Sequence, residues 1–299
     1  MFPIHQAQWL APKVRLIDVE APRVAKHHKP GHFVIVRVRE GGERIPLTIA
    51  RSDECTGLIT LVVQVVGATT EELCSLEVGE SIANVVGPLG KPTEIEQFGH
   101  AVLVGGGVGT AVIYPQAEAL KKAGNSVSAI IGGRSIEYVI FERELSEHCD
   151  VVYPCTDDGS YGYHGFVTGK LKDLIEATNT RVGAVLTAGP VPMMRAVADV
   201  TRTYAIKTIA SLNPIMVDGT GMCGGCRVTV AGEMKFACVD GPEFDAHAVD
   251  FTELADRLAT YRDQERIAWD RLHQQEDCRL PGAPACAGRE MEQAEARRG

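Results

Sequence analysis

The sequence predicts an antiparallel β-barrel followed by a parallel α/β domain, with a small C-terminal lobe and a final helix. Two observations lead to this prediction. Residues 1–97 contain short runs rich in valine and isoleucine between turn residues. From residue 98 onward, apolar runs alternate with helical patterns, as in a parallel sheet with crossover helices. A chain of 299 residues is long enough for two or three domains.

The first part has strand candidates at 32–39, 58–66 and 81–86, and a single short helix candidate at 70–76. Several short strands without long helices are typical of a small barrel, in which closure removes exposed sheet edges. We therefore assign residues 1–97 to a β-barrel.

One segment of this part, residues 44–50, has the chemistry of a flavin site. An arginine can pair with a phosphate, while a threonine hydroxyl and backbone groups can contact an isoalloxazine ring. An exposed β-turn is the alternative interpretation of the same residues. The turn 67–70 resembles an anion-binding turn that opens a short helix. The candidate flavin-binding residues are Arg44, Pro46, Leu47, Thr48, Val63, Gln64, Thr69 and Thr70.

The second part, residues 98–210, begins with an apolar run at 101–104, a glycine-rich turn at 105–110 and a helical pattern through Lys122. The remaining elements follow in alternation. Strands are expected at 127–131, 151–153 and 184–187, and helices at 135–147, 169–177 and 191–205.

A glycine-rich turn between a strand and a helix can admit a pyrophosphate to the helix N-terminus. The match to G-x-G-x-x-G is imperfect because Thr110 replaces the third glycine, and a turn that only joins strand to helix is the alternative. A second such turn lies at 189–194. Arg134 could favour a 2′-phosphate, so the choice between NADH and NADPH stays open. The candidate nucleotide-binding residues are Gly106, Gly107, Gly109, Thr110, Gly189 and Met193.

The cysteine loop, residues 216–227, places thiols and a carboxylate among glycines. With Cys238, the spacing is Asp-x4-Cys-x2-Cys-x11-Cys, the plant-type [2Fe–2S] pattern with aspartate in place of the first cysteine. Glycines permit positive φ and bring N–H groups to the sulfurs. Tetrahedral zinc and buried free thiols are the alternatives, and a turn role is the ordinary interpretation of Asp218. The candidate metal ligands are Asp218, Cys223, Cys226 and Cys238.

We assign residues 211–248 to a C-terminal lobe, 249–273 to an amphipathic helix and 274–299 to a flexible tail. The other six cysteines have no framework spacing, so we expect reduced thiols. They are Cys55, Cys74, Cys149, Cys155, Cys278 and Cys286.

Composition narrows the class of protein. Hydrophobic content of 45% and charged content of 23% are those of a globular protein. A net charge of −9 without a basic tract argues against nucleic-acid binding. The N-terminus lacks the order of a signal peptide, and the apolar stretch 101–113 is too short to span a bilayer. We therefore expect a cytoplasmic protein.

Taken in order, these motifs resemble the ferredoxin–NADP reductase superfamily. Within it, the chain resembles iron–sulfur flavoprotein subunits related to the dihydroorotate dehydrogenase electron-transfer subunit. It is most similar to the small subunit of NADH-dependent ferredoxin–NADP oxidoreductase, also called sulfide dehydrogenase, because the dihydroorotate relatives have cysteine at the position of Asp218. Residues 156–165 resemble a third nucleotide-domain turn, which adds Asp158 to the candidate cofactor-binding residues.

The resemblance implies FAD, a [2Fe–2S] cluster and NAD(H) or NADP(H). It implies a large partner flavoprotein subunit with [4Fe–4S] clusters, similar to the glutamate synthase small subunit, and possible contact with ferredoxin through an electron-bifurcating complex. Hydride transfer needs no acid–base side chain, so no catalytic residue is nominated.

Three other functions remain open from the sequence. They are a dihydroorotate dehydrogenase electron-transfer subunit, a zinc-stapled nucleotide-binding regulator, and an NAD(P)H–ferredoxin reductase that acts alone.

Overall fold

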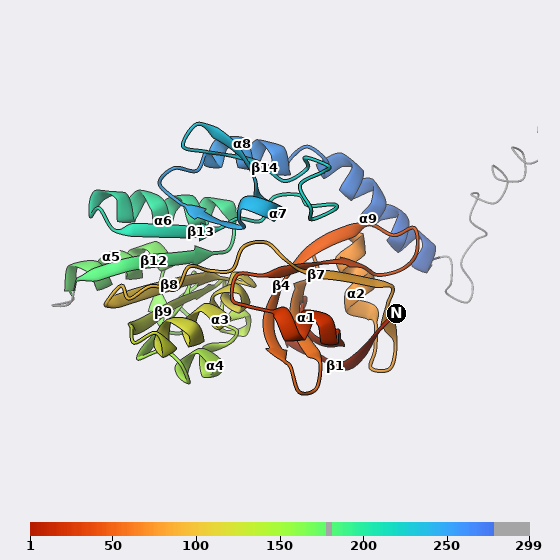
Figure 1. The fold of residues 1–299 in the computed structure, drawn as a ribbon, viewed down its shortest axis with the longest axis horizontal. Helices are drawn as coiled ribbons and strands as arrows, with labels where there is room; N and C mark the ends of the chain where they lie inside the picture. The colour runs from red at the N-terminus through yellow and green to blue at the C-terminus, as the bar shows by residue number, and fades with distance from the viewer. Residues whose placement is uncertain (178–180, 278–299) are drawn as a thin grey trace, which may run out of the picture.

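The structure is a computed structural model that describes residues 1–177 and 181–277. A barrel and a parallel sheet with its helices lie side by side, and the C-terminal segment lies across both (Figure 1). The predicted fold class, a β-barrel plus an α/β unit with a small C-terminal lobe, is confirmed.

The N-terminal sheet has the strand order β6-β1-β2-β5-β4-β3-β7, with every pair antiparallel. The end strands β6 and β7 are successive parts of one segment, separated only by Ala83, so this segment pairs at both edges and closes the barrel. The strands are β1 (Phe2–Ala11), β2 (Val14–Glu20), β3 (Phe33–Arg37), β4 (Arg44–Asp53), β5 (Leu58–Gln64), β6 (Ser81–Ile82) and β7 (Asn84–Leu89).

Alternation of side chains along the strands fills the barrel. Ile17 and Val19 of β2, for example, point inward with Ile59 and Leu61 of β5. Two short helices, α1 (Pro22–His27) and α2 (Ala68–Ser75), add apolar side chains to the same core. Strands β1 and β2 and helix α1 were not predicted, because their sequences mix polar and apolar residues without clear turn signals.

The second sheet has the order β11-β10-β9-β8-β12-β13-β16, parallel except for the last pair. Its strands are β8 (His100–Gly106), β9 (Ser126–Gly133), β10 (Val151–Thr156), β11 (Tyr163–His164), β12 (Val182–Ala188), β13 (Lys207–Ser211) and β16 (Glu243–Asp245). The chain moves from β8 to β9 and β10, then returns to the other side of β8 with β12. The β8/β12 boundary is therefore a topological switch point.

Helices cover both faces of this sheet. Ala101 and Leu103 of β8 pack with α3 (Gly109–Lys122) and α4 (Glu142–Ser146). Val102 and Val104 face α5 (Val167–Ala177) and α6 (Val191–Thr203). The predicted helix at 135–147 is instead a 3-10 turn, η1 (Ile136–Tyr138), followed by α4, because Phe141 adopts a left-handed φ of 62° that a continuous helix excludes.

The C-terminal lobe contains the hairpin β14 (Arg227–Val230) and β15 (Glu233–Phe236), then α7 (Ala237–Asp240) and β16. The single helix predicted over 249–273 is wrong. There are two helices, α8 (Phe251–Leu258) and α9 (Arg262–Asp277), because α8 buries its apolar face in the lobe while α9 turns away to reach α2 (Figure 1). Residues 274–277 of the predicted tail are helical, and the rest of that tail lies outside the described residues.

None of the helices in the described ranges is both long enough and apolar enough to cross a bilayer.

Candidate redox site

Two thiols of the C-terminal lobe converge. The β14–β15 hairpin returns the chain as predicted, so Cys226 and Cys238 lie with their Sγ atoms 3.2 Å apart, both buried. The backbone N–H of Cys238 also points at Cys226 Sγ, at 3.5 Å. Burial, with Cys226 as a close neighbour, raises the pKa of the Cys238 thiol to about 12. Only a bound cation would make two adjacent thiolates favourable here.

The other two candidate ligands lie on the exposed part of the cysteine loop. The Asp218 carboxylate accepts hydrogen bonds from the backbone N–H groups of Thr220 (2.8 Å) and Cys223 (2.7 Å), which hold its pKa below the usual value. The N–H of Gly225 points at Cys223 Sγ, at 3.4 Å. Asp218 therefore orders the loop around Cys223, the turn role that aspartate commonly takes.

The residues present fit a two-iron cluster better than a single ion. Within residues 1–177 and 181–277, no group of three His, Cys, Asp or Glu side chains lies close enough to hold one metal ion, as a zinc site would require. Each iron of a [2Fe–2S] cluster needs only two protein ligands. The C-terminal lobe places Cys226 beside Cys238, and Asp218 beside the backbone of Cys223. N–H groups near the sulfurs also suit an iron–sulfur site.

The cysteine loop rests on the barrel. A Cβ atom at Gly219, which has a φ of +74°, would lie 2.5 Å from Leu89 Cδ1 and 3.0 Å from Ile35 Cγ1. Only glycine allows this conformation and this close approach. Ile35 is a β3 residue and Leu89 a β7 residue, so the cysteine loop lies against the outer face of those strands at Gly219. The sequence gives no signal for this contact.

The candidate flavin strand β4 pairs with β3. The Cα partners are Pro46 with Ile35 and Thr48 with Phe33, so Pro46 and Thr48 share the face on which the lobe rests. Arg44 lies on that same face by alternation. Leu47 instead packs toward the barrel core. The candidate flavin face is therefore separated from the cysteine loop by a single strand.

Two residues of neighbouring β5 complete this part of the candidate set. Val63 is buried in the barrel core, whereas Gln64 is exposed at the end of the strand. Leu47 and Val63 thus have inward side chains, and only their backbone groups are available to a ligand on the outer face.

The turn before α2 adjoins the start of β4. The Thr70 hydroxyl accepts hydrogen bonds from the N–H groups of Val66 (2.9 Å) and Gly67 (3.0 Å), so it closes its own turn. The Thr69 hydroxyl donates to Glu43 Oε2 at 2.5 Å, next to Arg44. The structure thus places Glu43, the residue before Arg44, against the N-terminal turn of α2.

The glycine turns meet at the switch point between β8 and β12. A Cβ atom at Gly109 would lie 2.2 Å from Ala188 O, and one at Gly106 would lie 2.4 Å from Met193 Sδ. Gly189 also packs against Met193. These residues need glycine for close packing of helix and strand, which is one of the roles of a dinucleotide fingerprint.

The remaining nucleotide candidates differ in access. A Cβ atom at Gly107 has no neighbour within 4 Å, so this turn is open to a ligand. Thr110 is buried beneath it. Asp158 follows β10, at the same edge of the sheet but two strands away from β8. Its carboxylate accepts the N–H of Ser160 at 2.9 Å, and hydrogen bonds from Ser160 lower its pKa.

One residue that sequence reasoning missed joins all three parts. The Glu243 carboxylate of β16 accepts hydrogen bonds from Thr93 Oγ1 (2.7 Å), between barrel and sheet, and from Gln116 Nε2 (2.5 Å) of α3. It also lies beside Gly31 of the barrel. Burial raises the pKa of Glu243 to about 6. A single glutamate gives no sequence signal for such a role.

Comparison with known proteins identifies the family. A family model described as the iron–sulfur cluster binding domain of dihydroorotate dehydrogenase B matches residues 213–250. A Thermotoga maritima protein named dihydroorotate dehydrogenase B (NAD(+)), electron transfer subunit homolog is 49% identical over 254 residues, 85% of this chain and 89% of that protein. The chain belongs to the family of dihydroorotate dehydrogenase B electron transfer subunits and their homologues. The predicted family is thereby confirmed.

Two solved structures are also similar to this chain. An NADH-dependent reduced ferredoxin–NADP oxidoreductase, studied for flavin-based electron bifurcation, has 46% identity and a TM-score of 0.86, over 91% of this chain and 98% of that chain. Phthalate dioxygenase reductase, described as a modular structure for electron transfer from pyridine nucleotides to [2Fe–2S], has a TM-score of 0.56 at 14% identity, over 77% and 85% of the two chains. The second likeness shows the fold alone.

Proposed function

We propose that this chain is the pyridine-nucleotide-side subunit of an electron-bifurcating ferredoxin/NAD(P) oxidoreductase. It would hold FAD, a [2Fe–2S] cluster and NAD(H) or NADP(H), and pass electrons to a partner flavoprotein subunit. The observation that supports this best is the 46% identity to the NADH-dependent reduced ferredoxin–NADP oxidoreductase, which extends over nearly the whole of both chains.

Each of the three parts of the chain has its own binding role in this proposal. We assign flavin binding to residues 1–97, nucleotide binding to 98–210 and cluster binding to 211–248. When bound, the flavin supplies two-electron exchange with nicotinamide and one-electron exchange with the cluster. The protein positions the cofactors. The cysteine loop contacts β3, the strand next to Pro46 and Thr48 of β4, and this contact keeps the cluster site close to the flavin site.

The side chains have distinct roles in this proposal. Gly106, Gly107 and Gly109 open the switch point to the pyrophosphate of the nucleotide. Arg44 and the turn at 67–70 hold the flavin phosphates, with Pro46 and Thr48 against the ring. Asp218, Cys223, Cys226 and Cys238 hold the cluster.

We further propose the partner and its docking surface. Val217, Met222 and Val239 are neighbours of the candidate cluster ligands in the sequence and are 45%, 88% and 44% exposed. An apolar surface beside an exposed Cys223 fits a site that another protein covers. The partner is a large iron–sulfur flavoprotein subunit with [4Fe–4S] clusters, similar to the glutamate synthase small subunit, with ferredoxin reached through the complex. We expect the complex in the cytoplasm.

The second candidate is a dihydroorotate dehydrogenase electron-transfer subunit, which the family model and the names of the relatives favour. Purification of the natural complex and identification of its partner distinguish the two. We expect a large iron–sulfur flavoprotein, and recovery of a dihydroorotate-oxidising subunit instead would support the second candidate.

Spectroscopy of the isolated chain tests the remaining alternatives. We expect flavin absorption bands and a low-temperature EPR signal on reduction, with activity toward artificial acceptors but not ferredoxin. A colourless protein containing zinc would contradict the proposed function. Reduction of ferredoxin by the chain alone would instead indicate a self-sufficient reductase.

A further inference from the structure

Strand β4, which carries most of the candidate flavin residues, is irregular near its end. Its register against β5 shifts between Ile49 and Arg51, as at a β-bulge. Ile49 points into the barrel core, whereas the next two residues, Ala50 and Arg51, both contact side chains of the α/β unit. A bulge re-aims side chains in this way. Arg51 therefore leaves the barrel and reaches the helices beside the nucleotide sheet.

The Arg51 guanidinium contacts two aromatic rings and a carboxylate of the α/β unit. Its Cζ atom is 4.9 Å from the centroid of the Tyr114 ring in α3 and 5.4 Å from the centroid of the Phe141 ring. Its Nη2 atom lies 3.5 Å from Oε1 of Glu144 in α4. A guanidinium stacked on rings and paired with a carboxylate is held in both position and direction.

The aromatic rings that receive Arg51 are themselves held in place. Tyr114 and Phe141 are buried and meet edge to face, with ring centroids 5.5 Å apart. Phe141 also adopts a left-handed φ of 62°, which is costly for an aromatic residue. Such strain persists only where the surrounding packing imposes it, and it is concentrated at functional sites. The strained backbone thus presents the Phe141 ring to Arg51.

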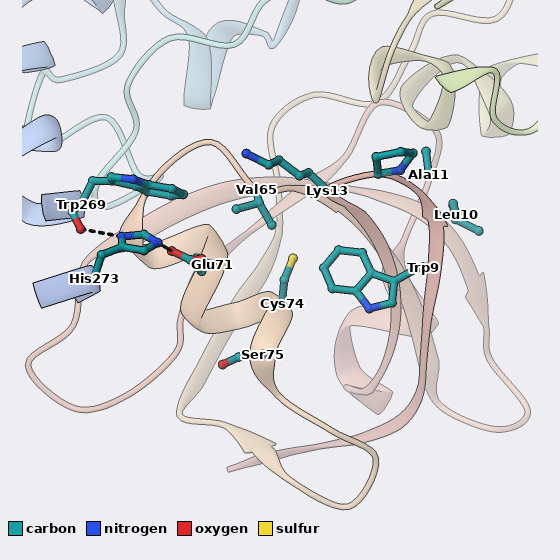
Figure 2. Close-up of a pocket in the computed structure, with 11 residues that line it drawn as sticks. Trp9, Leu10, Ala11, Lys13, Val65, Glu71, Cys74, Ser75, Trp269 and His273 are labelled. Atoms are coloured by element: carbon teal, nitrogen blue, oxygen red, sulfur yellow. Dashed lines mark hydrogen bonds and ion pairs between the residues drawn. The ribbon is translucent and has the colours of Figure 1, made fainter. Parts of the chain in front are cut away.

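The rest of the contact between the barrel and these helices is apolar. Figure 2 shows Leu10 and Ala11 on the side of a pocket of about 730 Å³ that lies opposite Trp269, so α9 and α3 contact the barrel on different sides. Apolar contacts are not directional, so they hold the two parts together without fixing the angle between them. The barrel residues in this contact are Leu10, Ala11, Val14, Leu16 and Ala50.

Arg51 joins the elements that carry the two candidate cofactor sites. Tyr114 belongs to the second turn of α3, and the first turn of that helix begins at Gly109, in the candidate nucleotide turn. Arg51 belongs to β4, the strand of the candidate flavin residues. A change in its contacts would alter the angle between these two elements.

We propose that Arg51 is a positioning residue for hydride transfer between the nicotinamide and the flavin. The inference rests on the proposed function, since it assumes that β4 holds the flavin and the turn before α3 holds the nucleotide. In that step the nicotinamide loses a hydride, two electrons with one proton, and is oxidised, while the flavin gains the hydride and is reduced. Arg51 acts through Tyr114, because the angle between β4 and α3 sets the distance that the hydride crosses.

Stopped-flow reduction of the FAD-loaded, full-length chain tests this role, with NADH or NADPH, whichever reduces the unaltered chain faster. Arg51→Met removes the cation and keeps an unbranched side chain. It should lower the limiting rate of flavin reduction by about 10-fold or more and change the apparent Kd of the nucleotide by less than about 2-fold, because binding is retained and only alignment is lost. Arg51→Lys should recover part of the rate, since an ammonium group can also lie over an aromatic ring.

Lys207→Met is the matched control. The Lys207 ammonium group makes the same two kinds of contact elsewhere, 5.1 Å from the centroid of the Phe98 ring and 3.2 Å from Oε1 of Glu96. Lys207 begins β13, so it lies at the edge of the parallel sheet opposite the glycine turn. This variant should keep the limiting rate of the unaltered chain.

Amide hydrogen exchange of the flavin-free chain gives a readout that does not depend on the redox reaction. Arg51→Met should speed exchange in β4 and in the first two turns of α3 but not in α5, because only the contact between the barrel and α3 is loosened. Lys207→Met should leave exchange in β4 and α3 unchanged.

Several results would overturn the inference while the proposed function stands. These are a limiting rate in Arg51→Met equal to that in Lys207→Met, a rise in the apparent Kd as large as the fall in rate, no recovery in Arg51→Lys, or unchanged exchange in both β4 and α3. Failure of the unaltered, FAD-loaded chain to accept hydride from either NADH or NADPH would overturn both proposals.

Discussion

Asp218 stands where a plant-type motif has cysteine, and its carboxylate accepts N–H groups of Thr220 and Cys223. A carboxylate is a harder donor than a thiolate, so it changes the electronic environment of a bound cluster. Asp218→Cys should therefore shift the reduction potential and change the EPR spectrum.

An EPR-monitored redox titration measures this change. Asp53→Cys is the matched control, because Asp53 also accepts an N–H group, that of Cys55 at 2.8 Å, in a turn far from the cysteine loop along the chain. An unchanged potential and spectrum in Asp218→Cys would remove Asp218 from the set of ligands and leave it the turn role alone.

Cys226 is the ligand candidate with the clearest geometry, because its sulfur is buried 3.2 Å from that of Cys238. Cys226→Ser should reduce bound iron and acid-labile sulfide to background, while FAD stays bound because the barrel is unchanged. Iron, sulfide and flavin analysis of the purified chain measures the result. Cys55→Ser, at an exposed thiol, should retain all three, and an iron content in Cys226→Ser equal to that control would exclude Cys226 as a ligand.

At the scale of elements, the start of α3 depends on contact with the end of β12. A Cβ atom at Gly109 would lie 2.2 Å from Ala188 O, so Gly109→Ala must push the helix away from the sheet. We expect a loss of about 1–3 kcal/mol in stability. A displaced turn should also lower kcat/KM for the pyridine nucleotide by about 10- to 100-fold.

Steady-state kinetics with an artificial acceptor, together with thermal unfolding, measures both effects. Lys122→Ala is the control, since Lys122 lies in the last turn of the same helix, far along it from the glycine turn, and its side chain is 73% exposed. Equal kcat/KM for the pyridine nucleotide in the two variants would show that the Gly105–Thr110 turn does not take part in nucleotide binding.

The sequence predicts elements well where a local pattern decides them. The strand, glycine turn and helix at 100–122 and the hairpin before Cys238 follow from periodicity and turn residues, and the structure has both. The division into α8 and α9 does not follow, because it depends on which surfaces each half contacts. The amphipathic pattern of 251–271 continues across the break, although α8 packs in the lobe and α9 reaches α2.

At the scale of the molecule, the contacts between parts are the least predictable, because they join residues distant in sequence. The lobe adds β16 to the nucleotide sheet, antiparallel to β13, and seats Gly219 against Ile35 of the barrel. For a similar reason, the candidate flavin-binding side chains do not all lie on one face of the barrel. Strand register, which the sequence does not specify, directs Leu47 and Val63 inward and Pro46 and Thr48 toward the lobe.

Glu243 makes the stability of the folded chain depend on pH. Its pKa is raised from 4.5 to about 6, first by burial and also by the negative charge of Glu94, while hydrogen bonds from Thr93 and Gln116 oppose the rise. The folded chain thus binds this proton more tightly than the unfolded chain. Its contribution to stability is greatest below pH 4.5, falls as the pH rises from 4.5 to 6, and is an almost constant penalty above that range.

Glu243→Gln keeps an oxygen acceptor for Thr93 and Gln116 but removes the charge. It should therefore stabilise the chain above pH 6, by about 1–2 kcal/mol or about 2–4 °C in Tm, and have little effect near pH 4.5. Thermal unfolding between pH 4.5 and 8 measures this. Glu94→Gln, at an exposed neighbour, should change stability by less than about 0.5 kcal/mol. A lower Tm for Glu243→Gln at pH 8 would mean that the ionised carboxylate stabilises the junction of the three parts.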